Sequence, residues 1–162
     1  MKDLPKRKPL RLPGYDYSQN GAYFVTICTE GRRPIFRTPV GADSISARMV
    51  DQIWRQTLAS YPGVDCPIYV IMPNHFHGIV TVERADMESA PTVSQVIQTF
   101  QRHTTIAYTK LVKEGLAPPY ERRVWQRSFY DHIIRSEAEY QEIWQYIHDN
   151  PVRWTEDIYY EE

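Results

Sequence analysis

Two apolar runs separated by a two-residue break constrain the fold of this chain more than any other feature. Residues 67–72 read Pro-Ile-Tyr-Val-Ile-Met, the break is Pro73-Asn74, and residues 75–82 read His-Phe-His-Gly-Ile-Val-Thr-Val. β-Branched and aromatic residues favour strands, whereas proline followed by asparagine is typical of a turn. The sequence therefore predicts neighbouring antiparallel strands at 68–72 and 75–82.

The second of these strands carries two histidines at its start. Successive side chains of a strand point to opposite faces, so His75 and His77 share one face and Phe76 lies on the other. Two imidazoles side by side are suited to holding a divalent metal ion. The same spacing also occurs on ordinary half-buried strands, so the motif alone leaves both interpretations open.

The chain as a whole is predicted to form one globular domain. Its 162 residues suit a single core, and its hydrophobic content of 42% argues against disorder. No apolar run approaches the length of a membrane span, and the basic N-terminus lacks the apolar stretch of a signal peptide, so we expect a cytoplasmic protein with no membrane partner. Cys28 and Cys66 each lie in an apolar segment and are expected to be core thiols.

Charged residues are segregated along the chain, although the net charge is only −1. Basic residues crowd the N-terminus, follow the first predicted strand at Arg32 and Arg33, and cluster again at Arg122, Arg123 and Arg127. Acidic residues gather in the last predicted helix and in the C-terminal tail. This segregation indicates either a phosphate-binding face or a solvated surface, and charge alone does not choose between them.

Turn signals and hydrophobic periodicity predict the other elements of the first two thirds of the chain. Residues 1–20 combine prolines with basic residues and are expected to form an extended basic arm. Residues 21–29 are rich in β-branched and aromatic side chains, which predicts a strand. Apolar residues recur every three or four positions over 46–60, which predicts a helix. A second helix is predicted from its cap Thr92 to Gly115.

The last third of the chain is predicted to add one strand and one helix. The stretch 122–132 is β-prone and rich in arginine, and a helix is expected from Ser136 to Asn150, where a proline ends it. The order β-α-β-β-α-β-α matches an α+β fold, a ferredoxin-like split βαβ antiparallel sheet with helices on one face and an added C-terminal helix. We place this domain at 21–154, followed by an acidic tail at 155–162.

The last predicted helix can supply what the histidines lack. A catalytic metal site needs a third ligand and a reactive group beside it. Tyr146 and Asn150 are four residues apart and therefore lie on one helix face. Tyr130 and Tyr140 lack such a partner, because an isoleucine and a tryptophan stand at that spacing. On packing grounds alone, Tyr146 is equally a ring at the edge of the core and Asn150 a helix-end residue.

Several motifs, in this order along the chain, resemble a known family. Residues 72–80 (Met-Pro-Asn-His-Phe-His-Gly-Ile-Val) resemble the His-hydrophobic-His motif of the single-tyrosine HUH nucleases. Further segments resemble the REP-associated tyrosine transposases: 23–26 (Tyr-Phe-Val-Thr), 125–127 (Trp-Gln-Arg), 131–135 (Asp-His-Ile-Ile-Arg) and 146–151 (Tyr-Ile-His-Asp-Asn-Pro). The resemblance covers most of the predicted domain, and several ordered motifs together are far more specific than the histidine pair alone.

The resemblance implies a chemistry and a set of residues. In similar proteins the two histidines and a residue one helical turn after the tyrosine hold Mg²⁺ or Mn²⁺, and these positions here are His75, His77 and Asn150. The tyrosine, here Tyr146, attacks a scissile phosphate, giving a 5′-phosphotyrosine and a free 3′-hydroxyl. The implied substrate is single-stranded DNA with a hairpin and a short flanking sequence, often a REP-like repeat of a bacterial genome, so the protein is expected to be nucleoid-associated.

DNA contacts are predicted among the arginines and one further histidine, because these side chains suit phosphates and unstacked bases. The outer face of the second helix also carries polar and basic residues, which either follow a nucleic-acid backbone or are simply solvated. The acidic tail is expected to lie across the basic face when DNA is absent. The candidate contacts are Arg32, Arg33, Arg102, Arg123, Arg127, His132 and Arg135.

Other functions remain compatible with the sequence. A DNA- or RNA-binding regulator on the same fold would bind without cleaving, although it would not need the histidine pair, the tyrosine and the amide together. A metal-dependent hydrolase of small molecules would need a carboxylate near the histidines, and the nearest on that strand, Glu83, stands at its far end. Tyr130 stays an alternative nucleophile. We expect a monomer, and a homodimer that exchanges its tyrosine helix is the alternative.

Overall fold

The structure is a computed structural model that describes residues 21–36, 44–83, 91–156 and 158–159. Within these residues, four strands and three α-helices follow one another in the predicted order. The elements are β1 (Gly21–Cys28), α1 (Ile45–Ala59), β2 (Val64–Met72), β3 (His75–Val82), α2 (Val93–Lys113), β4 (Tyr130–Ile134) and α3 (Glu137–Asp149), with short 3₁₀ turns η1 (Glu30–Arg32) and η2 (Trp154–Glu156).

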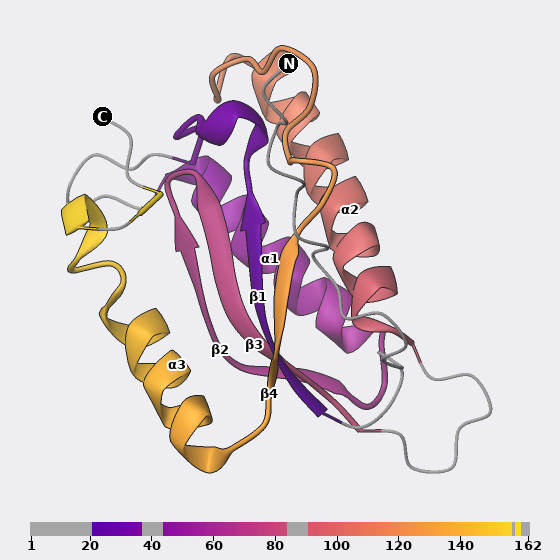
Figure 1. Ribbon diagram of the computed structural model, residues 1–162. Coiled ribbons are helices and arrows are strands. Elements are labelled where there is room, and N and C mark those ends of the chain that lie inside the picture. The colour runs from indigo at the N-terminus through magenta and orange to yellow at the C-terminus, as the bar shows by residue number, and fades with distance from the viewer. Residues whose placement is uncertain (1–20, 37–43, 84–90, 157, 160–162) are drawn as a thin grey trace, which may run out of the picture.

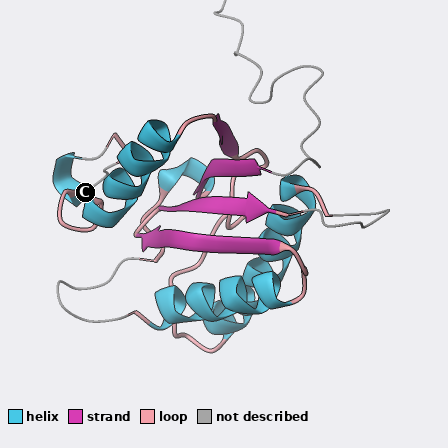
Figure 2. Ribbon diagram, turned by 90° about the horizontal axis from the view of Figure 1, so that it is seen from below, coloured by secondary structure: helices cyan, strands magenta, loops and turns pink. Residues whose placement is uncertain are grey.

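The strands form one antiparallel sheet in the order β2-β3-β1-β4 (Figure 1). The strand that carries the histidines, β3, is therefore a central strand. Helices α1 and α2 cover one face of the sheet, and α3 lies on the opposite face (Figure 2). This arrangement confirms the predicted α+β class, a ferredoxin-like sheet with helices on one face and an added C-terminal helix.

Aromatic side chains fill the core between the sheet and the helices α1 and α2. The ring of Trp54 from α1 lies 4.9 Å from that of Phe76 on β3 and 5.0 Å from that of Phe100 on α2. Trp125, from the segment before β4, joins this cluster 5.7 Å from Phe100. Because Phe76 faces this core, the histidines on either side of it face α3, as the alternation predicted.

Side-chain caps determine where the helices begin. The hydroxyl of Ser44 accepts a backbone hydrogen bond of α1 at 2.9 Å, and Ser136 does the same for α3 at 3.1 Å. Thr92 and Gln95 form a reciprocal capping box at the start of α2. Each cap satisfies a backbone N–H that has no partner within the helix. The caps at Thr92 and Ser136 were predicted.

The predicted fourth strand is confirmed, but its predicted position at 122–132 is wrong. Strand β4 begins only at Tyr130, where its pairing with β1 starts opposite Thr26. The residues before it pass the end of β1 and make a single isolated bridge, between Trp125 and Thr29. The indole N–H of Trp125 donates to Thr104 on α2 at 2.7 Å, so this anchor holds the segment in the core instead of along the sheet. The arginines of the segment consequently lie on a loop at the sheet edge.

Smaller differences concern the ends of the predicted elements. Strand β2 starts at Val64 instead of residue 68 and includes Pro67, which it tolerates because β2 is an edge strand with a register shift between Asp65 and Ile68. The predicted arm 1–20 lies outside the described residues, as do residues 157 and 160–162 of the predicted tail. Both cysteines are buried, as predicted. None of the described helices is long and apolar enough to cross a membrane.

Candidate metal and tyrosine site

The two histidines lie side by side at the start of β3, on the face covered by α3. Strand β1 pairs with β3 on one side and β2 on the other, so both imidazoles are flanked by strands. The ring centroids of His75 and His77 are 4.4 Å apart, and the exposed fractions of these residues are 0% and 1%. The central position in the sheet therefore fixes the direction of both rings.

The Nδ1 atom of each histidine has a polar partner. Asn74 donates through its side-chain N–H₂ to the carbonyl oxygens of Arg32 and Tyr159, at 3.0 and 2.6 Å, so its amide oxygen faces His75. His75 Nδ1 donates to that oxygen at 2.7 Å, which leaves Nε2 as the atom with the lone pair in the neutral ring. Nδ1 of His77 is 2.8 Å from the hydroxyl of Thr26 on β1. Partners of this kind orient the imidazoles of metal sites.

Burial also sets the charge of the second imidazole. It lowers the pKa of His77 well below the usual value of a histidine, and the neighbouring His75 lowers it further. A protonated imidazole has no lone pair for a metal ion, so a neutral ring is the form that can act as a ligand.

Helix α3 places Tyr146 against the second histidine. The Tyr146 hydroxyl is 3.4 Å from Nε2 of His77, and the two ring centroids are 5.3 Å apart. The Tyr146 ring also meets Phe24 of β1 edge to face at 6.0 Å. The residue is nevertheless 42% exposed, so part of it faces solvent. A phenol in this position can reach a substrate that binds over the sheet.

Asn150 caps the C-terminal end of α3, one helical turn after the tyrosine. It is 4% exposed, and its side-chain oxygen has no hydrogen-bond partner among the residues that the structure describes. A buried amide oxygen without a partner is costly, and a cation is one of the groups that can satisfy it. Imidazole nitrogens and an amide oxygen are donor types that suit a divalent cation.

This donor set differs from a conventional cluster of metal ligands. No group of three His, Cys, Asp or Glu side chains that could hold a metal ion occurs in the described part of the chain. The third candidate ligand is an amide, and Glu83, the carboxylate considered for a hydrolase, is exposed after the far end of β3. A carboxylate-based hydrolytic site is therefore absent from the described surroundings of the histidines.

A residue of the C-terminal tail covers both imidazoles. The Tyr159 ring lies 4.8 Å from that of His75 and 5.7 Å from that of His77. The guanidinium of Arg32 lies over the other part of this ring, 5.3 Å from its centroid. Tyr159 thus lies against the histidines and against one of the predicted DNA contacts.

Beside the histidines, four arginines line a cleft of about 720 Å³. Arg32 comes from η1, where it has a left-handed backbone with φ of 54°, a conformation that costs a non-glycine residue about 1 kcal/mol. Arg122, Arg123 and Arg127 come from the loop before β4, and none of them forms an ion pair with a described residue. The cleft contains one carboxylate, that of Glu30, so its charge is strongly positive.

The other predicted DNA contacts lie apart from this cleft or already have protein partners. Arg33 forms an ion pair with Glu121 at 2.7 Å. Arg102 lies on α2 in a neighbouring groove of about 380 Å³ that shares Arg122, Arg123 and Arg127 with the cleft. His132 is bonded to Glu139, whose other oxygen accepts the backbone N–H of Arg135 at 2.9 Å. The structure therefore gathers Arg32, Arg123 and Arg127 and separates His132 and Arg135 from them.

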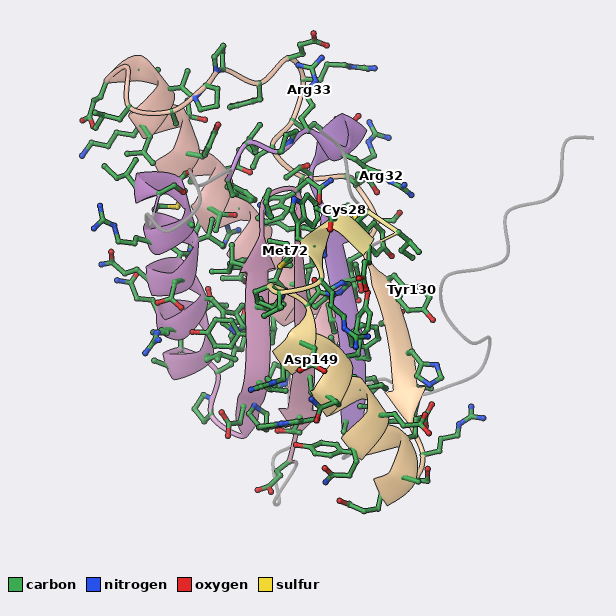
Figure 3. All side chains as sticks on the ribbon, turned by 90° about the vertical axis from the view of Figure 1, so that its left-hand side faces the viewer. Cys28, Arg32, Arg33, Met72, Tyr130 and Asp149 are labelled. Carbon is green, nitrogen blue, oxygen red and sulfur yellow. The ribbon has the colours of Figure 1, made fainter. Side chains whose placement is uncertain are left out.

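The two competing tyrosines occupy different environments. Tyr140 stacks on Trp144 within α3, with ring centroids 6.3 Å apart. Tyr130 is 45% exposed at the start of β4 and lines the arginine cleft. Figure 3 shows Tyr130 and Arg32 along the same side of the molecule. Only Tyr146 among the three tyrosines has a recorded contact with a histidine of the pair.

The sequence analysis did not select several residues that contact the histidines or line the arginine cleft. The sequence predicts only a turn at Asn74, although its place directly before His75 could indicate a partner for the imidazole. Thr26 and Phe24 were part of a predicted strand, and the alternation along it could have placed both on the histidine face. Arg122 was noted in the late basic cluster but not among the contacts.

Comparison with known proteins places the chain in a family. The family described as IS200-like transposases matches residues 17–150. An uncharacterized protein of Haemophilus influenzae is 30% identical over 167 residues, which cover 95% of this chain and 93% of that protein. The chain therefore belongs to the IS200-like transposase family.

Further comparisons confirm the resemblance to the REP-associated tyrosine transposases. A second Haemophilus influenzae protein, provisionally named a REP-associated tyrosine transposase, is 27% identical over 138 residues, covering 85% of this chain and 74% of that protein. A solved REP-associated tyrosine transposase bound to a REP hairpin superposes with a TM-score of 0.66 at 22% identity, covering 89% of this chain and 74% of that one. A provisionally named transposase of Deinococcus radiodurans superposes with a TM-score of 0.52 at 18% identity, covering 86% and 95%. These two structures share the fold.

Proposed function

We propose that this protein is a metal-dependent single-stranded DNA endonuclease and strand transferase that cleaves hairpin-containing repeat DNA through a 5′-phosphotyrosine on Tyr146. The observation that carries the proposal is the 3.4 Å distance from the Tyr146 hydroxyl to Nε2 of His77, which puts a nucleophile beside a candidate metal ligand. The REP hairpin bound to a related structure supports the choice of substrate. We further propose that the protein works at the nucleoid in the cytoplasm.

The proposed ligands of Mg²⁺ or Mn²⁺ are His75 and His77 through Nε2 and Asn150 through its amide oxygen. When bound, the cation supplies Lewis-acid stabilisation of the charge on the phosphate. The chain supplies the orientation, because Asn74 and Thr26 hold the imidazoles by Nδ1. The buried amide oxygen of Asn150 supports this assignment, since a cation would give it a partner.

In the cleavage step, the Tyr146 oxygen forms a bond to phosphorus as the bond from phosphorus to the 3′ oxygen breaks. The tyrosine hydroxyl loses its proton, and the departing 3′ oxygen ends as a hydroxyl. The phosphotyrosine is an ester of the same kind as the bond that was broken, so attack by a 3′-hydroxyl reverses the step and rejoins a strand. The reaction therefore needs no nucleotide cofactor.

The arginine cleft provides the binding part of this mechanism. Its guanidinium groups lie beside the face that carries Tyr146, and arginines bind phosphates through several N–H groups at once. Tyr146 reaches a histidine of its own chain, which supports a site complete within a monomer. An exchange of α3 between two subunits is not needed to bring the tyrosine to the histidines.

Denaturing electrophoresis tests the proposal directly. The protein would be incubated with labelled hairpin oligonucleotides from the extragenic repeats of its own genome, in Mg²⁺, Mn²⁺ or EDTA. We expect a covalent protein–DNA adduct that needs a metal ion, persists in Tyr130→Phe and disappears in Tyr146→Phe.

Each other outcome contradicts a defined part of the proposal. Loss of the adduct in Tyr130→Phe, but not in Tyr146→Phe, would make Tyr130 the nucleophile. An adduct that forms equally in EDTA would contradict the proposed role of a metal ion. Binding of many hairpins without any adduct would favour a non-cleaving DNA- or RNA-binding regulator on the same fold.

A further inference from the structure

We propose that Tyr130 is a stacking platform for one unpaired base of the DNA and thereby positions the adjoining phosphate for Tyr146. The inference rests on the proposed function for the identity of the ligand, single-stranded DNA. It gives Tyr130 a role that does not involve its hydroxyl, and it adds a base-binding subsite to the phosphate-binding cleft.

The first observation is the exposure of the ring. Among the described tyrosines, tryptophans and phenylalanines, Tyr130 and Tyr146 are the two exposed ones, at 45% and 42%. Aromatic rings are normally buried because of their large apolar area, so exposed rings that gather at one place indicate a binding surface. Tyr146 has the proposed role of nucleophile, whereas the mechanism leaves Tyr130 without a role.

The second observation is that one phenyl ring supports both tyrosines. The Phe24 ring of β1 contacts both of them, with its centroid 6.5 Å from that of Tyr130 and 6.0 Å from that of Tyr146. It also stacks on His77 at 5.3 Å. Tyr130 therefore contacts the same phenyl ring as the proposed nucleophile Tyr146 and the candidate metal ligand His77. This shared contact limits how Tyr130 can move relative to them.

The contact with Phe24 leaves a face of the Tyr130 ring available. The two ring planes are at 76°, an edge-to-face arrangement. Whichever ring contributes its edge, Phe24 can cover at most one face of Tyr130, and Phe24 is the one aromatic contact that the described residues give it. A base needs one open face to stack on.

The third observation is the charge around the ring. Tyr130 and the neighbouring Phe129 line the cleft of about 720 Å³ together with Arg32, Arg122, Arg123 and Arg127. Proteins that hold single-stranded nucleic acids combine a positive groove for the backbone with aromatic rings for the bases. The cleft has both parts, and Tyr130 is its exposed aromatic residue.

The other residues on this face of β4 cannot take the same role. His132 is two residues further along the strand and is bonded to Glu139 of α3. Ile134 follows at the end of the strand and has no aromatic face. Tyr130 is the residue of β4 nearest the arginine loop, so a base on its ring places the backbone between the loop and Tyr146.

Fluorescence of 2-aminopurine tests this inference without any cleavage. The probes are hairpin oligonucleotides with single-stranded flanks, carrying one 2-aminopurine at successive flank positions, bound to the Tyr146→Phe protein in EDTA. We expect quenching at one flank position, because stacking quenches this base. The quenching should persist in Tyr130→Phe and Tyr130→Trp and disappear in Tyr130→Ala and Tyr130→Leu.

Affinity gives a second readout, with leucine as the matched control for apolar area. From the free energy of base–aromatic stacking, Tyr130→Ala is expected to weaken binding of the flanked hairpin about 5-fold to about 150-fold. Tyr130→Leu should weaken binding similarly, Tyr130→Phe should not, and a blunt hairpin without flanks should bind all variants alike. Thermal unfolding of each variant checks that the fold is intact.

The outcomes separate this inference from the proposed function. Equal affinity and equal quenching in Tyr130→Ala would overturn the stacking role, even if the wild-type protein forms the adduct on Tyr146. Tyr130-dependent quenching in a protein that forms no adduct would support the stacking role and contradict the nuclease. Wild-type affinity in Tyr130→Leu would show that the apolar area of the side chain is enough for binding. That result would overturn the proposed stacking of a base on Tyr130. A protein that binds no flanked hairpin would contradict both.

Discussion

His75 and His77 are almost completely buried, whereas the arginines of the neighbouring cleft are exposed or half-buried. The histidines lie on a central strand and are held through Nδ1 by Asn74 and Thr26. Most of the arginines lie on a loop and have no carboxylate partner among the described residues. The first region is preorganised for one geometry, and the second is adaptable and strongly charged.

Under the proposed function, the buried histidines are expected to determine the rate of the chemical step, and the exposed arginines are expected to determine the affinity for DNA. Preorganised donors act on the reacting atoms because they need not rearrange during the reaction. Exposed arginines bind a backbone whose conformation varies, and their contribution decreases as salt increases. Changes in the two regions should therefore alter different measured quantities.

The largest effect is expected from loss of a histidine. His77→Gln removes a candidate ligand and should reduce the rate of adduct formation at least about 100-fold, since even partners of ligands contribute this much. The affinity for the hairpin in EDTA should remain within about 2-fold of wild type, because the arginine cleft is unchanged. His148→Ala is the control, because His148 is an exposed imidazole that, among the described residues, is bonded only to Asp149. A parallel loss of hairpin affinity in His77→Gln would contradict the separation of chemistry and binding between the two regions.

Loss of the hydrogen-bond partner of His75 should have the next largest effect. Asn74→Ala removes the acceptor for His75 Nδ1 and the donor to the carbonyl of Arg32. We expect the apparent Mn²⁺ affinity to fall about 10-fold to about 100-fold, with the rate of adduct formation recovering at high metal concentration. A metal titration of adduct formation measures this. A reduced rate at saturating Mn²⁺ with unchanged metal affinity would contradict the assigned role.

Uncovering the histidines should increase activity moderately. Tyr159→Ala removes a ring that packs on both imidazoles. From the free energy of aromatic pairs, adduct formation should rise about 2-fold to about 10-fold. Ile158→Ala is the control, since Ile158 is 79% exposed. An unchanged rate in Tyr159→Ala, measured at subsaturating metal, would show that the tail does not compete with the reaction.

Substitutions in the arginine cleft should change the salt dependence of DNA affinity and leave the rate of the chemical step unchanged. Arg123→Ala and Arg127→Ala are each expected to reduce the slope of log K against log salt concentration by about 0.7, the value for one contact with single-stranded DNA. The rate of adduct formation at saturating DNA should equal that of wild type. Arg55→Ala, on the opposite face of the sheet and paired with Asp51, is the control. A lower saturated rate in either cleft variant would mean that the cleft also orients the phosphate.

The smallest effect concerns the attachment of α3 to β4. The backbone N–H of Arg135 and the side chain of His132 lower the pKa of Glu139 below its usual value of 4.5. A carboxyl with a lowered pKa in the folded state stabilises the fold above the unfolded pKa, and this stabilisation is lost as the pH falls through the folded pKa. Glu139→Gln should therefore lower the urea midpoint slightly at neutral pH, and this difference should disappear only once the pH has fallen below the lowered pKa of the folded state, whereas Glu142→Gln should have no effect at either pH.

The prediction of the fold succeeded where local signals decide the structure. The alternation along 75–82 placed both histidines on one face, and the caps at Thr92 and Ser136 marked two helix starts. It failed at 122–132, because β-propensity cannot show that Trp125 is held by Thr104 of α2. At the candidate site, helical spacing selected Tyr146 over Tyr130 and Tyr140, and in the structure it is Tyr146 that contacts His77.

The sequence by itself determined the spacing of the candidate ligands along each element and the order of those elements. Only the tertiary structure decided that residues from β1, β3, β4 and α3 meet around Phe24, and that η1 and the loop before β4 form one cleft. The physical reason is that periodicity and capping act within a few residues, whereas strand pairing and side-chain packing join positions more than fifty residues apart.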